Sequence, residues 1–230
     1  MSTDSGPASQ PEDLPSVDRL LALSDGVVAI ALTLLVLQLR VPPLRNVLDP
    51  NSASDLAAQL GKDGDQLVSY LISFYVIAHF WLIHHRVFQH LSGQRESLAW
   101  WNFGFLFTIT IMPFTSDLLG EYSDNPLAVD IFALNLLLAS LATQATLDLG
   151  RRKGLMTPGS HALAVRAGVL RAAGASGVIG ASMGLAWVST DAAKYCWLLL
   201  AVVPRVVNRW QRRQAGPDGA APGGAGSGPA

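Results

Sequence analysis

Hydrophobic residues occur along this chain in long blocks separated by polar stretches, and not in the short periods of a soluble domain. The first block covers residues 20–39, and a helix of about 20 residues rises about 30 Å, the hydrocarbon thickness of a bilayer. Five further blocks cover residues 66–88, 98–119, 127–149, 162–188 and 192–207. The pattern predicts an all-α integral membrane protein with six transmembrane helices.

The polar stretches at the ends and between the blocks give the domain organisation. Residues 1–18 are polar, acidic and rich in Pro and Ser, and residues 211–230 are rich in Gly, Ala and Pro. Such compositions cannot build a packed core, so both segments are expected to be disordered cytoplasmic tails. Residues 19–210 then form one six-helix transmembrane domain, with a short surface helix in the long connection at 41–65.

Lysine and arginine gather on one side of the expected spans, and this asymmetry sets the orientation of a membrane protein. With a cytoplasmic N-terminus, Arg40, Arg45, Lys62 and Lys194 lie outside. All the other basic residues then lie inside: Arg19, Arg86, Arg95, Arg151, Arg152, Lys153, Arg166, Arg171, Arg205, Arg209, Arg212 and Arg213. The asymmetry predicts a multi-pass protein of the cell membrane with both termini in the cytoplasm.

Composition narrows the function classes. Only 14% of the residues are charged, against about a quarter in soluble domains, and the net charge of −1 gives no sign of nucleic-acid binding. Cys196 is the only cysteine, which excludes a disulfide within the chain and a cysteine-based metal site. No Ser/His/Asp, Cys/His or metal-ligand pattern stands out. We therefore expect neither an enzyme nor a bound cofactor or metal.

Polar residues within the expected spans fall at one depth, near the cytoplasmic side. Asp25 lies in the inner third of the first helix, beside Arg19 and Ser24. The end of the second helix and the start of the third bring further polar groups to this depth: His84, His85, Arg86, Trp101 and Asn102. A buried polar group without a partner is costly in a membrane, so these groups are expected to bond with one another. We interpret Asp25 as the hub of this polar network.

Bulky aliphatic residues form a narrow stripe on the first helix, made of Ile30, Leu34 and Leu37 and bordered by Thr33. At about 100° per residue, Leu34 lies about 40° and Leu37 about 20° from Ile30, whereas Asp25 lies about 140° away. Lipid contact is the usual explanation of such a stripe. The angles alone do not distinguish a lipid face from a pore face.

Three stretches carry a resemblance to a known family. The segment R-x-x-x-L-S-D-G-V-V-A-I-A-L-T-L-L-V-L from Arg19 resembles the R-x-x-x-F-S-D opening of the transmembrane protein 175 family of potassium channels. The runs FWLIHHRVF and WWNFGFLFTITIMPF resemble the second and third helices of its bacterial members. Leu23 stands where the family usually has Phe, which is a change between two bulky apolar residues.

The resemblance implies a function and an assembly that composition does not give. Bacterial members are homotetramers of one six-helix unit, in which the first helix lines the pore. Rings of bulky aliphatic side chains form the constriction, which by position is Ile30, with Leu34 and Leu37 one and two turns outward and Thr33 as the nearby threonine. The partners it implies are further copies of the chain, membrane lipids and permeant K⁺.

A proton-coupled or cation secondary transporter is the other class kept open. Such carriers usually have internal repeats and broken helices around a site at the middle of the membrane. The sequence has no evident repeat and no pair of acidic residues at that depth. A potassium-permeable channel is therefore preferred.

Overall fold

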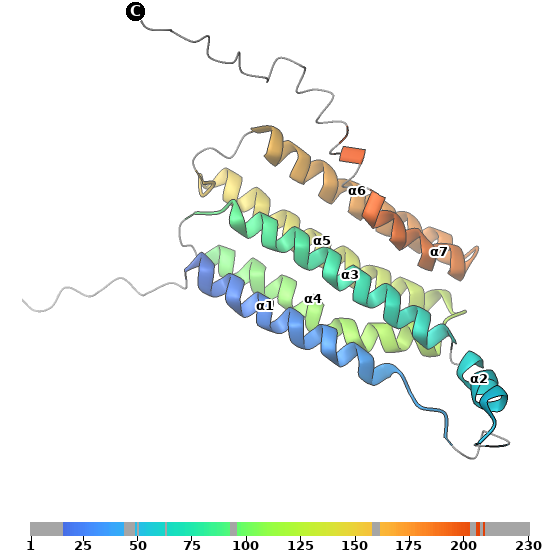
Figure 1. Cartoon of the computed structure of the whole chain (residues 1–230). Coiled ribbons are helices and arrows are strands. Elements are labelled where there is room, and N and C mark those ends of the chain that lie inside the picture. The colour runs from blue at the N-terminus through green and yellow to red at the C-terminus, as the bar shows by residue number, and fades with distance from the viewer. Residues whose placement is uncertain are drawn as a thin grey trace, which may run out of the picture.

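The computed structural model describes residues 16–43, 49, 51–62, 64–92, 96–157, 162–202, 206, 207 and 209. Within these residues the chain is helical, and the long helices lie side by side in a bundle (Figure 1). The elements are α1 (Val17–Leu34), η1 (Leu35–Gln38), α2 (Ala53–Lys62), α3 (Gly64–Gln89), α4 (Glu96–Glu121), α5 (Pro126–Arg152), α6 (Ala162–Ala186), α7 (Thr190–Cys196) and η3 (Trp197–Ala201). The expected short helix in the connection at 41–65 is α2.

Five helices of the described chain are long and apolar enough to cross a membrane. They are Val17–Gln38, Gly64–Gln89, Glu96–Glu121, Pro126–Arg152 and Gly168–Ala186. The sixth apolar block forms the short helix α7 and the 3₁₀ helix η3, and positions 203–205 and 208 within its continuation lie outside the described residues. The sixth span therefore stays a prediction, and the expected tails lie outside the described residues except for positions 16–18.

Local sequence explains where several helices begin. The side-chain oxygen of Ser16 accepts a hydrogen bond from the backbone N–H of Arg19 at 3.3 Å, which caps the start of α1. Asn125 caps α5 in the same way, and Pro126 follows at the first helical position, where its missing N–H has no cost. After α5 the chain turns at Gly154, whose φ of 66° lies in the region that glycine adopts without strain.

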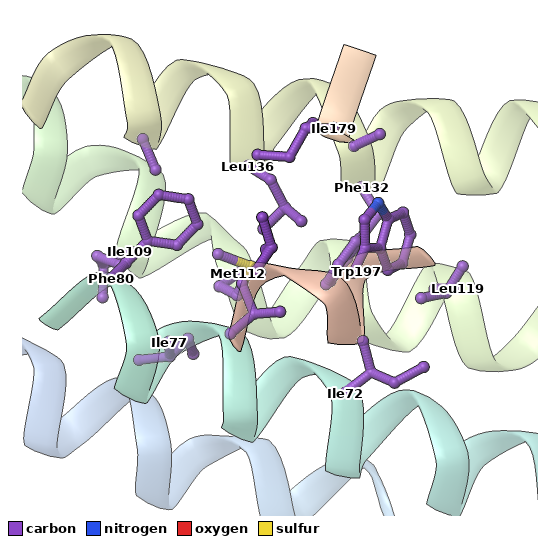
Figure 2. Packing of buried hydrophobic residues seen from close by; sticks show 14 of the residues in the cluster. Ile72, Ile77, Phe80, Ile109, Met112, Leu119, Phe132, Leu136, Ile179 and Trp197 are labelled. Carbon is purple, nitrogen blue, oxygen red and sulfur yellow. The ribbon is translucent and has the colours of Figure 1, made fainter. Parts of the chain in front are cut away.

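The core is shared by helices that are distant in the sequence. Helix α4 packs against α1, α3 and α5, and α5 also packs against α6. Aromatic and aliphatic side chains from α3, α4, α5 and α6 fill the space between these helices (Figure 2): Phe80, Ile109, Met112, Phe132, Leu136 and Ile179. The short η3 contributes Trp197, which is fully buried against Phe132 and donates its indole N–H to Ser182 at 2.8 Å.

Candidate functional site

Helix α1 has two different faces, and packing fixes which of them points inward. One face is buried against α3 and α4 and consists of Leu20, Ser24, Val28, Ala31 and Leu35. Their spacing of three and four residues places them on one side of the helix. The opposite face must therefore look away from the subunit.

The aliphatic stripe lies on that outward face. Ile30 is 60% exposed, Leu34 44% and Leu37 73%, and Thr33 is exposed beside them. The Thr33 hydroxyl donates to the Ile30 carbonyl of its own helix at 2.8 Å, so its polarity is satisfied within α1. None of the residues that the structure describes covers this surface, which can meet lipid, another subunit or a pore.

A polar junction joins α1, α3 and α4 at the end of the bundle where α1 begins. Its centre is the side-chain oxygen of Asn102 on α4, which lies 3.0 Å from the hydroxyl of Ser24 and 2.8 Å from Nε2 of His84. Because this oxygen only accepts, the His84 Nε2–H donates to it, and the Ser24 hydroxyl shares its single proton between this oxygen and the Leu20 carbonyl at 2.8 Å. All three side chains are buried. The rings of Phe88 and Phe105 stack on the two sides of the imidazole and hold it in place.

Asp25 takes part in a second, adjacent contact. Its carboxylate accepts a hydrogen bond from the indole N–H of Trp81 on α3 at 2.8 Å. Trp81 packs on His85, whose Nε2 lies 2.9 Å from the side-chain nitrogen of Gln89. Since consecutive residues point about 100° apart around a helix, α1 presents Ser24 to α4 and Asp25 to α3. The junction of three helices is therefore centred on Asn102, whereas Asp25, expected as the hub, bonds to α3.

Three other residues expected in the polar network lie at its margin. Arg19, Arg86 and Trp101 are exposed. Among the described residues, their side chains make no hydrogen bond or ion pair with the junction. Trp81, which bonds to Asp25, is a member of the network that the sequence analysis did not name. A sequence signal was available, because Trp81 lies one turn before His85 on the same face of α3.

The structure offers no metal centre in the part of the chain that it describes. No group of three or more His, Cys, Asp or Glu side chains there could hold an ion. His84 is instead engaged with Asn102, and His90 places its Nδ1 2.6 Å from the carbonyl of Arg86. The polar side chains of this end of the bundle thus connect helices.

The fold and these faces define a multi-pass α-helical membrane protein whose first span exposes an apolar stripe between Ile30 and Leu37. Residues 19–113 match the family described as endosomal/lysosomal potassium channel TMEM175. A protein of Streptomyces collinus named as a potassium channel is 32% identical over 189 residues, which cover 80% of this chain and 89% of that protein. The chain belongs to the TMEM175 family, which is a family of ion channels and not of enzymes.

Two further comparisons place the chain within the family. The crystal structure of a lysosomal potassium-selective channel TMEM175 homologue from Chamaesiphon minutus superposes with a TM-score of 0.71 at 25% identity, over 84% of this chain and 98% of that one. A human relative, named as the endosomal/lysosomal proton channel TMEM175, is 27% identical over 54% of this chain and 23% of its own length. The two bacterial relatives therefore match this chain in overall size, and the human one is more than twice as long.

Replacing Asn102 by leucine is expected to destabilise the protein more than replacing Asp25 by asparagine. Asn102→Leu leaves the buried His84 without its acceptor, which costs about 1–3 kcal/mol. Asp25→Asn keeps an oxygen for the indole of Trp81 and only weakens that bond. The thermal unfolding midpoints of the two variants in one detergent measure the difference.

The matched control is Trp101→Phe, because Trp101 lies next to Asn102 in sequence and is exposed. Its unfolding midpoint should stay near that of the unmodified protein. A larger loss for Asp25→Asn than for Asn102→Leu would restore Asp25 as the central residue. Normal stability with altered ion selectivity in Asp25→Asn would instead place the carboxylate on the ion path.

Proposed function

We propose that this protein is a potassium-permeable channel of the cell membrane, built from four copies of the chain around a pore lined by α1. The observation that carries the proposal is the outward-facing apolar stripe of Ile30, Leu34 and Leu37, which the described part of the chain leaves exposed. Membership of the TMEM175 family and the names of the bacterial relatives support K⁺ as the permeant ion. Six spans with both ends inside complete the proposed subunit.

The chemistry of such a pore follows from the side chains that the stripe presents. Four Ile30 side chains around an axis form a narrow ring that offers no oxygen to replace the hydration water of an ion. A hydrophobic constriction of this kind can open and close by wetting and dewetting. Leu34 and Leu37 form wider rings further along, and Thr33 adds a hydroxyl beside the constriction. No bound cofactor is needed for this passive conduction.

Reversal potentials of the purified protein in a planar bilayer, under a gradient of K⁺ against Na⁺, test the proposal. A channel that prefers K⁺ shifts the reversal potential toward the K⁺ equilibrium value, and single molecules give discrete current steps. A proton-coupled or cation transporter turns over stoichiometrically and gives no such steps. Transport without current steps would therefore assign the protein to the carriers.

Ile30→Asn is expected to raise the current and to lower the preference for K⁺. The amide is more polar and less bulky around the axis than the isoleucine, so the constriction becomes wetter and wider. Leu34→Asn and Leu37→Asn should act in the same direction but more weakly. Single-channel conductance and reversal potential, at equal amounts of reconstituted protein, give the measurement.

The structure also decides which control is suitable for Ile30→Asn. Val28 and Leu35 lie off the stripe, but both are buried in the core, so a polar residue there would disturb folding. Leu138→Asn is the better control, since Leu138 is exposed on α5. Conductance of Leu138→Asn should equal that of the unmodified channel. Equal conductance of Ile30→Asn and the unmodified channel would show that Ile30 does not line the pore.

Cysteine labelling tests the proposed orientation. In a Cys196→Ala background, a cysteine at Asp124 should react with an impermeant thiol reagent added outside intact cells, and one at Lys153 should not. Both positions are exposed, whereas neighbouring Ser123 is buried with its hydroxyl bonded to Asp65. Lys153 is also preferable to Gly154, whose left-handed backbone would strain a cysteine. The opposite labelling pattern would invert the topology.

A further inference from the structure

Helix α2 lies outside the bundle, beside the beginning of α3 (Figure 1). It covers Ala53–Lys62 and has no buried residue, unlike α1, α3, α4 and α5. Ten residues of helix rise about 15 Å, half of what a membrane span requires. This helix therefore cannot cross a bilayer and must lie on one side of it.

The neighbouring contacts place α2 at the level where the spans leave the hydrocarbon. At the start of α3, Asp65 accepts a hydrogen bond from Ser123 at 2.6 Å and Gln66 donates one to Glu121 at 3.0 Å. These polar pairs tie the beginning of α3 to the end of α4. Lys62 ends α2 two residues before Gly64, which limits their separation to about 7 Å. The end of α2 is thus held close to the bilayer surface.

On α2 the apolar residues are more exposed than the polar ones, which is the reverse of a helix on the surface of a soluble protein. Leu56 is 41% exposed and Leu60 is 52% exposed, one turn apart on the same face. The polar residues Asp55 and Gln59 lie on another face and are half-buried. A helix in water buries its leucines and exposes its carboxylates. The outward leucines of α2 therefore point to an apolar environment beyond the subunit.

The polar residues of α2 form hydrogen bonds with other residues of the same chain. The Asp55 carboxylate accepts from the backbone N–H of Asp49 at 3.2 Å, and the Lys62 ammonium donates to the Gln59 side-chain oxygen at 3.1 Å. Asp55 and Lys62 are the only charged residues of α2 and cancel one another. Attachment of α2 would therefore depend on its leucines and not on anionic lipid.

We propose that α2 is a membrane-surface helix that inserts Leu56 and Leu60 into the boundary between headgroups and acyl chains of a phospholipid bilayer. The adjacent span supports this occupant, because α3 exposes Leu67, Leu71 and Phe74 at one-turn spacing directly after α2. Apolar side chains are thus exposed both on α2 and on the first turns of the span that follows it. The inference does not depend on which ion the protein conducts.

Depth-dependent fluorescence quenching tests the membrane-surface helix. Single cysteines at Leu56, Leu60 and Lys62 in the full-length Cys196→Ala protein are labelled with an environment-sensitive fluorophore. The labelled proteins are reconstituted into vesicles of zwitterionic phosphatidylcholine, with and without a spin-labelled acyl chain. Lys62 is the matched control, since it lies on the same helix, is exposed, and belongs to the polar face.

Labels at positions 56 and 60 should be quenched about twofold or more by the spin-labelled lipid and protected from aqueous iodide, as expected for side chains at the acyl boundary. The label at position 62 should show the opposite pattern. Equal iodide quenching at 56, 60 and 62 would place α2 in water and overturn the proposal. Protection from both quenchers at 56 and 60 would overturn it as well, because a second copy of the chain would then cover the leucines.

Discussion

In hydrocarbon, water is not available to pair with a polar group, and this constraint governs every long helix of the protein. Backbone N–H and C=O groups are satisfied within the helices, which is why the membrane part is helical. Polar side chains have only each other and the backbone as partners. Ser24, His84 and Asn102 meet for this reason, and so do Asp25 and Trp81. These contacts join α1 to α3 and α4. They determine the position of α1 along the other two helices, which apolar packing alone would not determine.

The polar junction also determines what α1 offers to its surroundings. Ser24 holds one face of the helix against α4, and Val28, Ala31 and Leu35 continue that contact along the same side. The helix cannot rotate without breaking the junction, so Ile30 and Leu37 stay on the outer face. The junction and the stripe lie on opposite sides of one helix, and the first fixes the direction of the second. In the proposed channel, a wall held in this way obtains its rigidity from contacts away from the ion path.

The family gives this arrangement a functional setting. Relatives of the same fold are named for potassium and, in animals, for protons. In a pore lined as proposed here, the apolar stripe contains no group that coordinates one ion in preference to another, so small differences in pore width and wetting can separate these outcomes. The match to the human relative covers only 54% of this chain.

Much of the fold was predictable from the sequence, because hydropathy and helical period are local properties. The apolar blocks gave the five long helices, the segment at 41–65 gave α2, and the spacing of Ile30, Leu34 and Leu37 gave a single stripe. The motif from Arg19 identified the family. The sequence also indicated that α1, α3 and α4 meet through polar side chains, because polar groups at one membrane depth must bond with one another.

Only the tertiary structure decided which partner each polar group has and which faces are covered. Asn102 became the centre of the junction because its oxygen lies between α1 and α3, whereas Asp25 points toward Trp81. The sequence also did not predict that the leucines of α2 face outward, because an amphipathic pattern does not determine which face of a helix packs against the protein. These features depend on the angle at which helices far apart in the chain pack together. That angle follows from all their contacts at once, and no single segment contains it.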